Sequence, residues 1–178
     1  MALKPTIYKA DFNLVDLDNN RFETLKLTLA QHPSETLNRM MVRVLVYAMN
    51  YHPDLMFTKG LSSQDEPEIW QISPDGRVEH WIELGQASPE RIRKGVSRAE
   101  QISLYAYGSE VDVWWPKHQA AFAALPKLRV FSFDNRQVEK LDSFVARTME
   151  LTLTITDGEL YLTGQGEELT LQVEPLLG

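Results

Sequence analysis

Two segments near the N-terminus alternate apolar and polar residues. In residues 7–14 and again in residues 24–29, every second side chain is apolar. This period of two predicts strands that bury one face. The turn-forming residues Asp18-Asn19-Asn20 lie between them, so the two strands are expected to form an antiparallel pair.

Apolar side chains at steps of three and four predict a first helix over residues 37–48. Pro33-Ser34 supplies the signals for its start. Glu35, Arg39 and Arg43 follow one another at steps of four on the side expected to face solvent. A surface ion pair between Glu35 and Arg39 is therefore the simplest interpretation of Glu35.

A second helix is predicted to begin at Ser88-Pro89, where the serine caps the helix and the proline takes its first position. Arg91, Lys94 and Arg98 share one of its faces, and residues 91–98 contain no acid. A solvated helix face is the usual meaning of such a run. The same basic patch could also contact the phosphates of nucleic acid.

Residues 65–85 are predicted to form a β-hairpin that carries acidic side chains. Two short runs rich in Ile, Val and Trp flank Pro74-Asp75-Gly76-Arg77, which has the composition of a turn. Counting back from this loop gives the pairs Ser73 with Val78, Trp70 with Trp81 and Glu68 with Glu83. Like charges at about 5 Å destabilise a sheet, so the last pair predicts a raised pKa or a cation between the carboxylates. A slip of one residue would instead move every side chain to the other face.

The second half of the chain predicts a β-α-β unit and a meander. Residues 102–107 and 128–133 are short apolar runs with a mostly helical segment between them, which favours a parallel pair. A further helix is expected over residues 134–145, and residues 151–173 alternate in three strands. The predicted fold is α/β (α+β): a mixed central β-sheet with flanking helices and an antiparallel C-terminal β-meander. We expect it to form a single domain over residues 1–178.

Composition and charge narrow the chemistry. The absence of cysteine from the 178 residues excludes disulfides, thiolate zinc sites and cysteine nucleophiles. No apolar stretch is long enough to span a bilayer, so the protein is expected to be cytoplasmic, with no membrane partner. The net charge is −7, but residues 139–178 hold eight acids and two bases, whereas residues 1–138 hold seventeen acids and sixteen bases. The part that contains the hairpin is nearly neutral and could still meet a polyanion.

Oxygen ligands are the candidate chemistry that remains. The chain has no glycine-rich phosphate loop between a strand and a helix and no metal-spaced histidine pair, and its four scattered histidines are expected to be structural. Glu35, Asp65, Glu68 and Glu83 offer hard carboxylates, which without His or Cys select Mg²⁺ or Mn²⁺. Lys94 would lie roughly 9 Å along its helix, level with the carboxylates.

The order of helix, hairpin, acidic strand, basic helix and strand resembles the PD-(D/E)XK nuclease fold. This resemblance implies that the acidic places, which bind a metal ion, are taken by Glu35, by Glu68 with Asp65, and by Glu83. Gly85 stands where that fold has the lysine that polarises water. Lys94 could substitute for this lysine.

Four motifs, spread over the whole length of the chain, resemble the bacterial YaeQ family. They are His32-Pro33-Ser34-Glu35, Asp65-Glu66-Pro67-Glu68, Trp81-Ile82-Glu83-Leu84-Gly85 and Trp114-Trp115. The resemblance implies a variant of the PD-(D/E)XK fold. It supports the architecture more than a reaction, because one fold carries many functions.

Two functions are compatible with these residues, and a purely structural or assembly role is a third alternative for which the sequence offers nothing positive or negative. The first is a Mg²⁺- or Mn²⁺-dependent phosphodiesterase of nuclease type acting on nucleic acid, in which Lys94 is the charge that activates water. Its metal ligands or their orienters would be Glu35, Glu68 and Glu83, with Asp65 as a further acidic ligand, and its phosphate contacts would be Arg91 and Arg98. The second is a catalytically inactive binding module of the same fold, which holds nucleic acid or a protein partner without cutting it. Gly85 in the lysine place and the acidic C-terminal third favour this second function.

Overall fold

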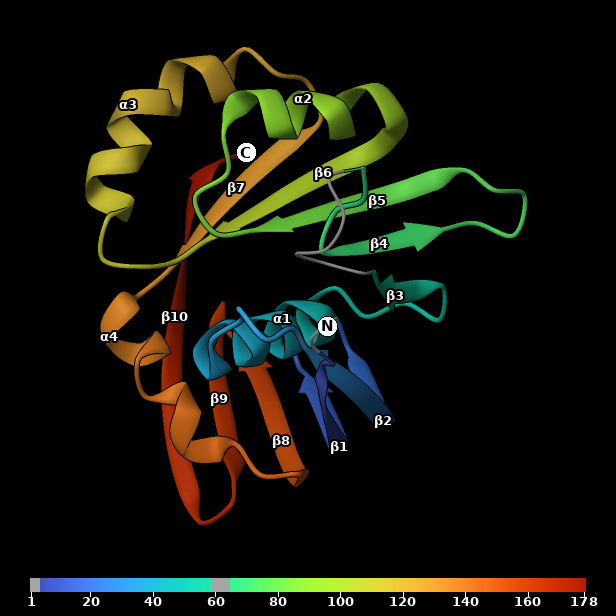
Figure 1. The fold of residues 1–178 in the computed structure, drawn as a ribbon, viewed down its shortest axis with the longest axis vertical. Coiled ribbons are helices and arrows are strands. Elements are labelled where there is room, and N and C mark those ends of the chain that lie inside the picture. The colour runs from blue at the N-terminus through green and yellow to red at the C-terminus, as the bar shows by residue number, and fades with distance from the viewer. Residues whose placement is uncertain (1–3, 59–64) are drawn as a thin grey trace. The chain divides into compact units, whose positions relative to one another are not determined.

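The structure, a computed structural model, describes residues 4–58 and 65–178 (Figure 1). Contacts within the chain divide it into two units. Unit 1 contains Met1–Met49 and Arg136–Val173, and unit 2 contains Asn50–Asn135 and Glu174–Gly178. In the part of the chain that is described, no helix is long and apolar enough to cross a membrane.

Unit 1 is built around the N-terminal hairpin. β1 (Thr6–Asp16) and β2 (Arg21–Gln31) pair antiparallel, as their alternation predicted. β1 also pairs in parallel with β8 (Thr148–Thr156). The chain continues from β8 through β9 (Glu159–Gly164) to β10 (Glu167–Leu177), and these three strands form the predicted antiparallel meander.

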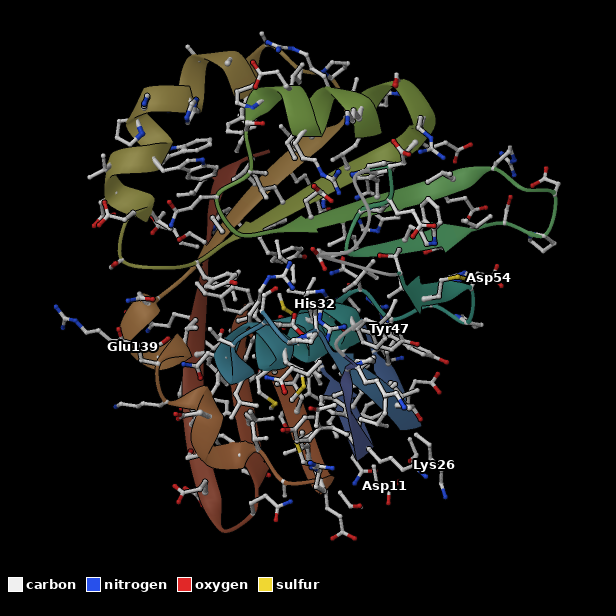
Figure 2. All side chains as sticks on the ribbon, in the orientation of Figure 1. Asp11, Lys26, His32, Tyr47, Asp54 and Glu139 are labelled. Carbon is white, nitrogen blue, oxygen red and sulfur yellow. The ribbon has the colours of Figure 1, made fainter. Side chains whose placement is uncertain are left out.

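The two faces of the hairpin differ as a period of two requires. Its buried face consists of Ala10, Phe12, Leu14, Leu25, Leu27 and Leu29. On the exposed face Asp11 and Lys26 are cross-strand partners and lie side by side (Figure 2). Opposite charges in such a pair favour this register over its alternatives.

The first helix, α1 (Leu37–Met49), contacts β2 and β8. It begins at Leu37, where the apolar spacing predicted, and its cap is Thr36 rather than Ser34, because the amide of Arg39 donates to the Thr36 hydroxyl at 3.1 Å. The prediction that Arg43 faces solvent is wrong, because Arg43 is 6% exposed. The buried guanidinium of Arg43 therefore needs a partner inside unit 1. This partner is Glu35, as described below.

Unit 2 contains a mixed sheet in the order β3-β4-β5-β6-β7. β3 (Leu55–Phe57), β4 (Ile69–Ile72) and β5 (Val78–Leu84) are antiparallel. β6 (Ala99–Ala106) and β7 (Leu128–Phe133) continue the sheet in parallel with β5. The predicted β-α-β unit with a parallel pair is confirmed.

Two helices cover one face of the parallel strands (Figure 1). α2 (Pro89–Arg98) begins as predicted, since the Ser88 hydroxyl accepts a hydrogen bond from the amide of Arg91 at 3.2 Å. α3 (Val111–Ala123) joins it over a core formed by Trp81, Ile92, Ile102, Leu104, Trp114, Phe122 and Val130. The mixed sheet with flanking helices confirms the predicted fold class.

The helix predicted over residues 134–145 is wrong in its length. The structure has a single turn, α4 (Asn135–Val138), and then a 3-10 helix (Leu141–Phe144). Val138, Leu141 and Phe144 are all buried. One continuous helix and two short helical turns can both bury apolar residues at this spacing. The apolar pattern alone therefore does not determine the length of the helix.

The acidic hairpin has the predicted centre and a different loop. Trp70 is the partner of Trp81, as counted, but a bulge after Gln71 pairs Ile72 with Val78, so the predicted pairing of Ser73 with Val78 is wrong. The reason is a tighter turn, in which the amide of Gly76 donates to the carbonyl of Ser73 at 2.9 Å. Gly76 has φ +88°, the left-handed conformation that ends a three-residue hairpin loop with a bulge.

Gly95 lets α2 approach the sheet closely. A β-carbon at this position would lie 2.9 Å from Cδ1 and Nε1 of the buried Trp81 ring. Alanine favours a helix over glycine by about 0.5–1 kcal/mol, while overpacking a core costs about 1–3 kcal/mol. We expect Gly95→Ala to lower the free energy of unfolding by about 1–2 kcal/mol in urea denaturation. In a Trp81→Phe background the smaller ring should remove most of this loss, and an equal loss in both backgrounds would contradict the steric cause.

Candidate functional site

Glu83 in β5 is the centre of the acidic hairpin, and its partner is a cation from α2. The carboxylate is buried, with 5% of the side chain exposed, and Arg91 binds both of its oxygens. The distances are 2.6 Å from Nε to Oε2 and 3.3 Å from Nη2 to Oε1. A two-point contact of this kind is among the strongest that a carboxylate forms with a side chain.

The arginines of α2 also hold the segment that precedes β4. Nη2 of Arg91 donates to the carbonyl of Glu66, and Nη1 of Arg98 donates to the carbonyl of Asp65 at 2.7 Å. The Arg98 guanidinium lies 5.4 Å from the ring centroid of Trp81, within the range of a cation-π contact. Arg91 and Arg98, predicted as phosphate contacts, are thus engaged with unit 2 itself.

Glu68 lies just before β4 and beside β5, the strand that carries Glu83. Its amide donates to the carbonyl of Ile82 at 3.1 Å, and Ile82 is the residue that directly precedes Glu83. The side chain is buried, with Glu68 8% exposed as a residue. Asp65 is exposed, and its carbonyl rather than its carboxylate meets Arg98. The hairpin therefore brings two buried acids, Glu68 and Glu83, to neighbouring positions.

Lys94 lies on the exposed side of α2 and forms no ion pair with any acid in the described part of the chain. Its neighbour Arg93 is also exposed and approaches Glu90 only at 3.9 Å. The cation that reaches Glu83 is therefore Arg91, one helical turn away from Lys94. The predicted role of Lys94 in activating water stays a prediction.

Glu35 belongs to unit 1, where it forms a buried charge cluster. Its carboxylate contacts Arg39 at 2.5 Å and Arg43 at 2.7 Å and 2.9 Å. Arg43 also donates to the carbonyl of Ala30 at 3.0 Å. Only 2% of the Glu35 side chain is exposed. The predicted pair with Arg39 is present, but its location on the surface is wrong, because both partners are largely covered.

The fit of a divalent metal can be judged from these contacts. Among residues 4–58 and 65–178 no group of three or more Asp, Glu or His side chains is placed to hold an ion. Both oxygens of Glu83, the acid at the centre of the predicted site, are bound by a guanidinium. The side chains as arranged do not fit Mg²⁺ or Mn²⁺, which needs several oxygen ligands free to face it.

Sequence reasoning missed a second polar group in unit 2. Nε2 of His80 and the Ser103 hydroxyl are 2.8 Å apart on neighbouring strands, and both residues are buried. Burial, followed by the nearby charge of Arg129, lowers the pKa of His80 to about 4. His80 is thus a neutral buried histidine, as its structural interpretation expects, and no short sequence pattern marks its partner Ser103.

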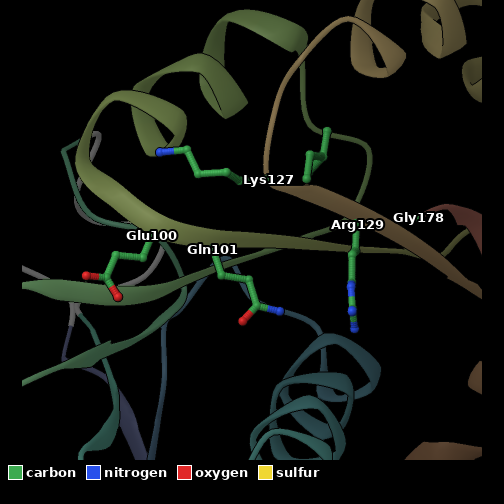
Figure 3. A pocket seen from close by; sticks show the side chains of 6 residues that line it. Glu100, Gln101, Lys127, Arg129 and Gly178 are labelled. Carbon is green, nitrogen blue, oxygen red and sulfur yellow. The ribbon is translucent and has the colours of Figure 1, made fainter.

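A shallow pocket of about 550 Å³ lies beside this group in unit 2 (Figure 3). Gln101 and Arg129 project into it from the same side of their strands. Nζ of Lys127, by contrast, donates to the carbonyls of Val96 and Ala99 at 3.2 Å and 3.0 Å, so this lysine caps the end of α2. Lys127 therefore has a structural role.

Comparison with known proteins gives one consistent result. Residues 1–173 match the family model described as YaeQ protein. Proteins called "Uncharacterized protein YaeQ" from Salmonella typhi and Escherichia coli are 44% and 40% identical over 174 residues, covering 97% of this chain and 96% of each relative. The crystal structure of YaeQ protein from Xanthomonas axonopodis pv. citri is 34% identical, with a TM-score of 0.94 over 98% of this chain and 99% of that chain. The corresponding protein from Pseudomonas syringae is 38% identical, with a TM-score of 0.93 over 98% and 97%.

Proposed function

This chain belongs to the YaeQ family, and we propose that it acts as a nucleic-acid-binding module of nuclease-like architecture that does not cleave its ligand by a metal-dependent mechanism. The observation that carries the proposal is the two-point contact between Arg91 and Glu83. In a metal-dependent nuclease the carboxylates must face the ion and the scissile phosphate. Here the central carboxylate is neutralised from within the protein.

The exposed cations of α2 support the choice of a polyanionic ligand. Arg93 and Lys94 are exposed neighbours, and Glu90 is the only acid in this ten-residue helix. Arg91 and Arg98 are bound to protein oxygens, so their predicted phosphate contacts would require these bonds to break. We therefore assign the first phosphate contacts to Arg93 and Lys94.

Binding through two cations should be weak and sensitive to salt. With two phosphates neutralised, the logarithm of the binding constant should fall against the logarithm of salt concentration with a slope of about −1.8 for duplex DNA and about −1.4 for single strands. Fluorescence anisotropy with labelled oligonucleotides at a series of salt concentrations measures this slope. The double variant Arg93→Gln/Lys94→Gln should bring it close to zero, while Lys26→Gln in unit 1 should leave it unchanged.

The same preparation tests the competing hydrolase. Protein incubated with nucleic acid and Mg²⁺ or Mn²⁺ should leave the substrate intact. Cleavage that Glu83→Gln abolishes would restore the phosphodiesterase hypothesis, with Lys94 as its activating charge. Failure to bind any nucleic acid at low salt would instead favour the protein-partner form of the binding module.

A further inference from the structure

The oxygens around Arg91 in unit 2 form a set that a metal ion would also accept. Its guanidinium is bound by both carboxylate oxygens of Glu83 and by the carbonyl oxygen of Glu66. A carboxylate and a backbone carbonyl are hard ligands of the kind that Mg²⁺, Mn²⁺ and Ca²⁺ prefer. These oxygens converge on one positive group.

We infer that Arg91 is a built-in cation, which fills an oxygen-lined site in place of a divalent ion and makes the site independent of metal. The inference rests on the proposed function, because it explains how the acidic hairpin keeps its charge balance without a metal-dependent reaction. It adds a specific claim, namely that the Glu83 and Glu66 oxygens form a latent metal site. Removing the guanidinium opens that site.

Burial explains why some cation must be present. The Glu83 side chain is 5% exposed, and an ionised carboxylate at such a position is costly unless it is paired. The Arg91 side chain is 23% exposed, so the guanidinium reaches the acid from a position that solvent can enter. An ion that arrives from solvent could therefore reach the same oxygens and complete its coordination with water.

The helix positions the guanidinium. Arg91 and Arg98 lie four residues before and three residues after Gly95, so all three share one face. That face meets the sheet, because Gly95 packs directly on the Trp81 ring. Glu83 lies two residues beyond Trp81 in β5 and projects to the same face of the sheet. The close approach of α2 thus sets Arg91 over Glu83.

The test compares Mn²⁺ binding by wild type and by Arg91→Gln, using isothermal titration calorimetry and melting temperature. Wild type should show no binding that depends on Glu83. Arg91→Gln should gain a site, and at a Mn²⁺ concentration roughly 100 times its dissociation constant the ratio of folded to unfolded protein should rise about 100-fold. Arg93→Gln, on the same helix with an exposed side chain, is the matched control and should gain nothing.

Two further variants keep the inference falsifiable. Glu83→Gln added to Arg91→Gln should abolish the new Mn²⁺ response, because the ligand carboxylate is lost, whereas Arg91→Lys should keep a cation in place and gain no site. If Arg91→Gln does not fold alone, added Mn²⁺ should restore its folded signal. A folded Arg91→Gln that ignores Mn²⁺, an unfolded one that Mn²⁺ does not rescue, or a wild type that binds Mn²⁺ through Glu83 would overturn the inference. None of these outcomes depends on nucleic-acid binding, which the salt series measures separately.

Discussion

Replacing Glu35 by alanine is expected to lower the free energy of unfolding by about 3–5 kcal/mol, the usual loss when one partner of a buried ion pair is removed. Glu35 forms ion pairs with both Arg39 and Arg43, whose side chains are 14% and 7% exposed. Without the carboxylate, two guanidinium groups would remain covered beside one another. Denaturation in urea, monitored by circular dichroism, measures the change.

The matched control is Glu168→Ala, an exposed acid in the same unit, which should change stability by less than about 0.5 kcal/mol. Replacing Glu35 and Arg43 together by methionine should cost less than the sum of the two single changes, because the unpaired charge is removed with its partner. A loss for Glu35→Ala no greater than the control would show that the cluster does not stabilise unit 1.

Acid should destabilise the protein through His80, by about 3 kcal/mol between pH 6.5 and pH 4. The pKa of His80 falls from 6.5 in the unfolded chain to about 4 in the folded protein, because burial disfavours the charged ring and Arg129 repels it. Between these two pH values the unfolded state binds more protons, so the free energy of unfolding rises with pH. The stability is complete above pH 6.5 and is lost as the pH falls toward 4, at about 1.4 kcal/mol per pKa unit.

The His80 contribution can be separated from that of the carboxylates by difference. Stability is measured from pH 4 to pH 7.5 for wild type and for His80→Gln, which keeps a polar partner for Ser103. The wild-type curve should be steeper between pH 4 and 6.5, and NMR should show His80 neutral at pH 5.5. His52→Gln, with a side chain 45% exposed, is the control and should follow the wild-type curve. Parallel curves for wild type and His80→Gln would contradict the lowered pKa.

Most of the local structure follows from short-range patterns in the chain. Alternation in β1 and β2 predicted both strands and their pairing. When one face of a sheet is buried, a shift of one residue would move every apolar side chain to the exposed face, so the register is fixed. Ser88-Pro89 predicted the start of α2, since capping depends on neighbouring residues alone. The partnership of Trp70 and Trp81 also followed from counting, because the bulge lies on the loop side of that pair.

The pairing of charged side chains, by contrast, depends on long-range packing. Arg91, Lys94 and Arg98 share a helix face in the sequence, but successive residues turn by about 100° around a helix, so Lys94 lies at the edge of the stripe that Gly95 presses against the sheet. Arg91 therefore reaches Glu83, and Lys94 remains exposed. A glycine inside a predicted helix is the one signal that could have shown this packing in advance.

The burial of Glu35 has the same origin. Steps of four placed Glu35, Arg39 and Arg43 in a row, and such a row is usually solvated. The contact of Arg43 with the carbonyl of Ala30 shows that the end of β2, the strand that precedes the helix, covers this row within unit 1. Sequence spacing determines which side chains share a face of a helix, whereas the rest of the fold determines whether water or protein meets that face.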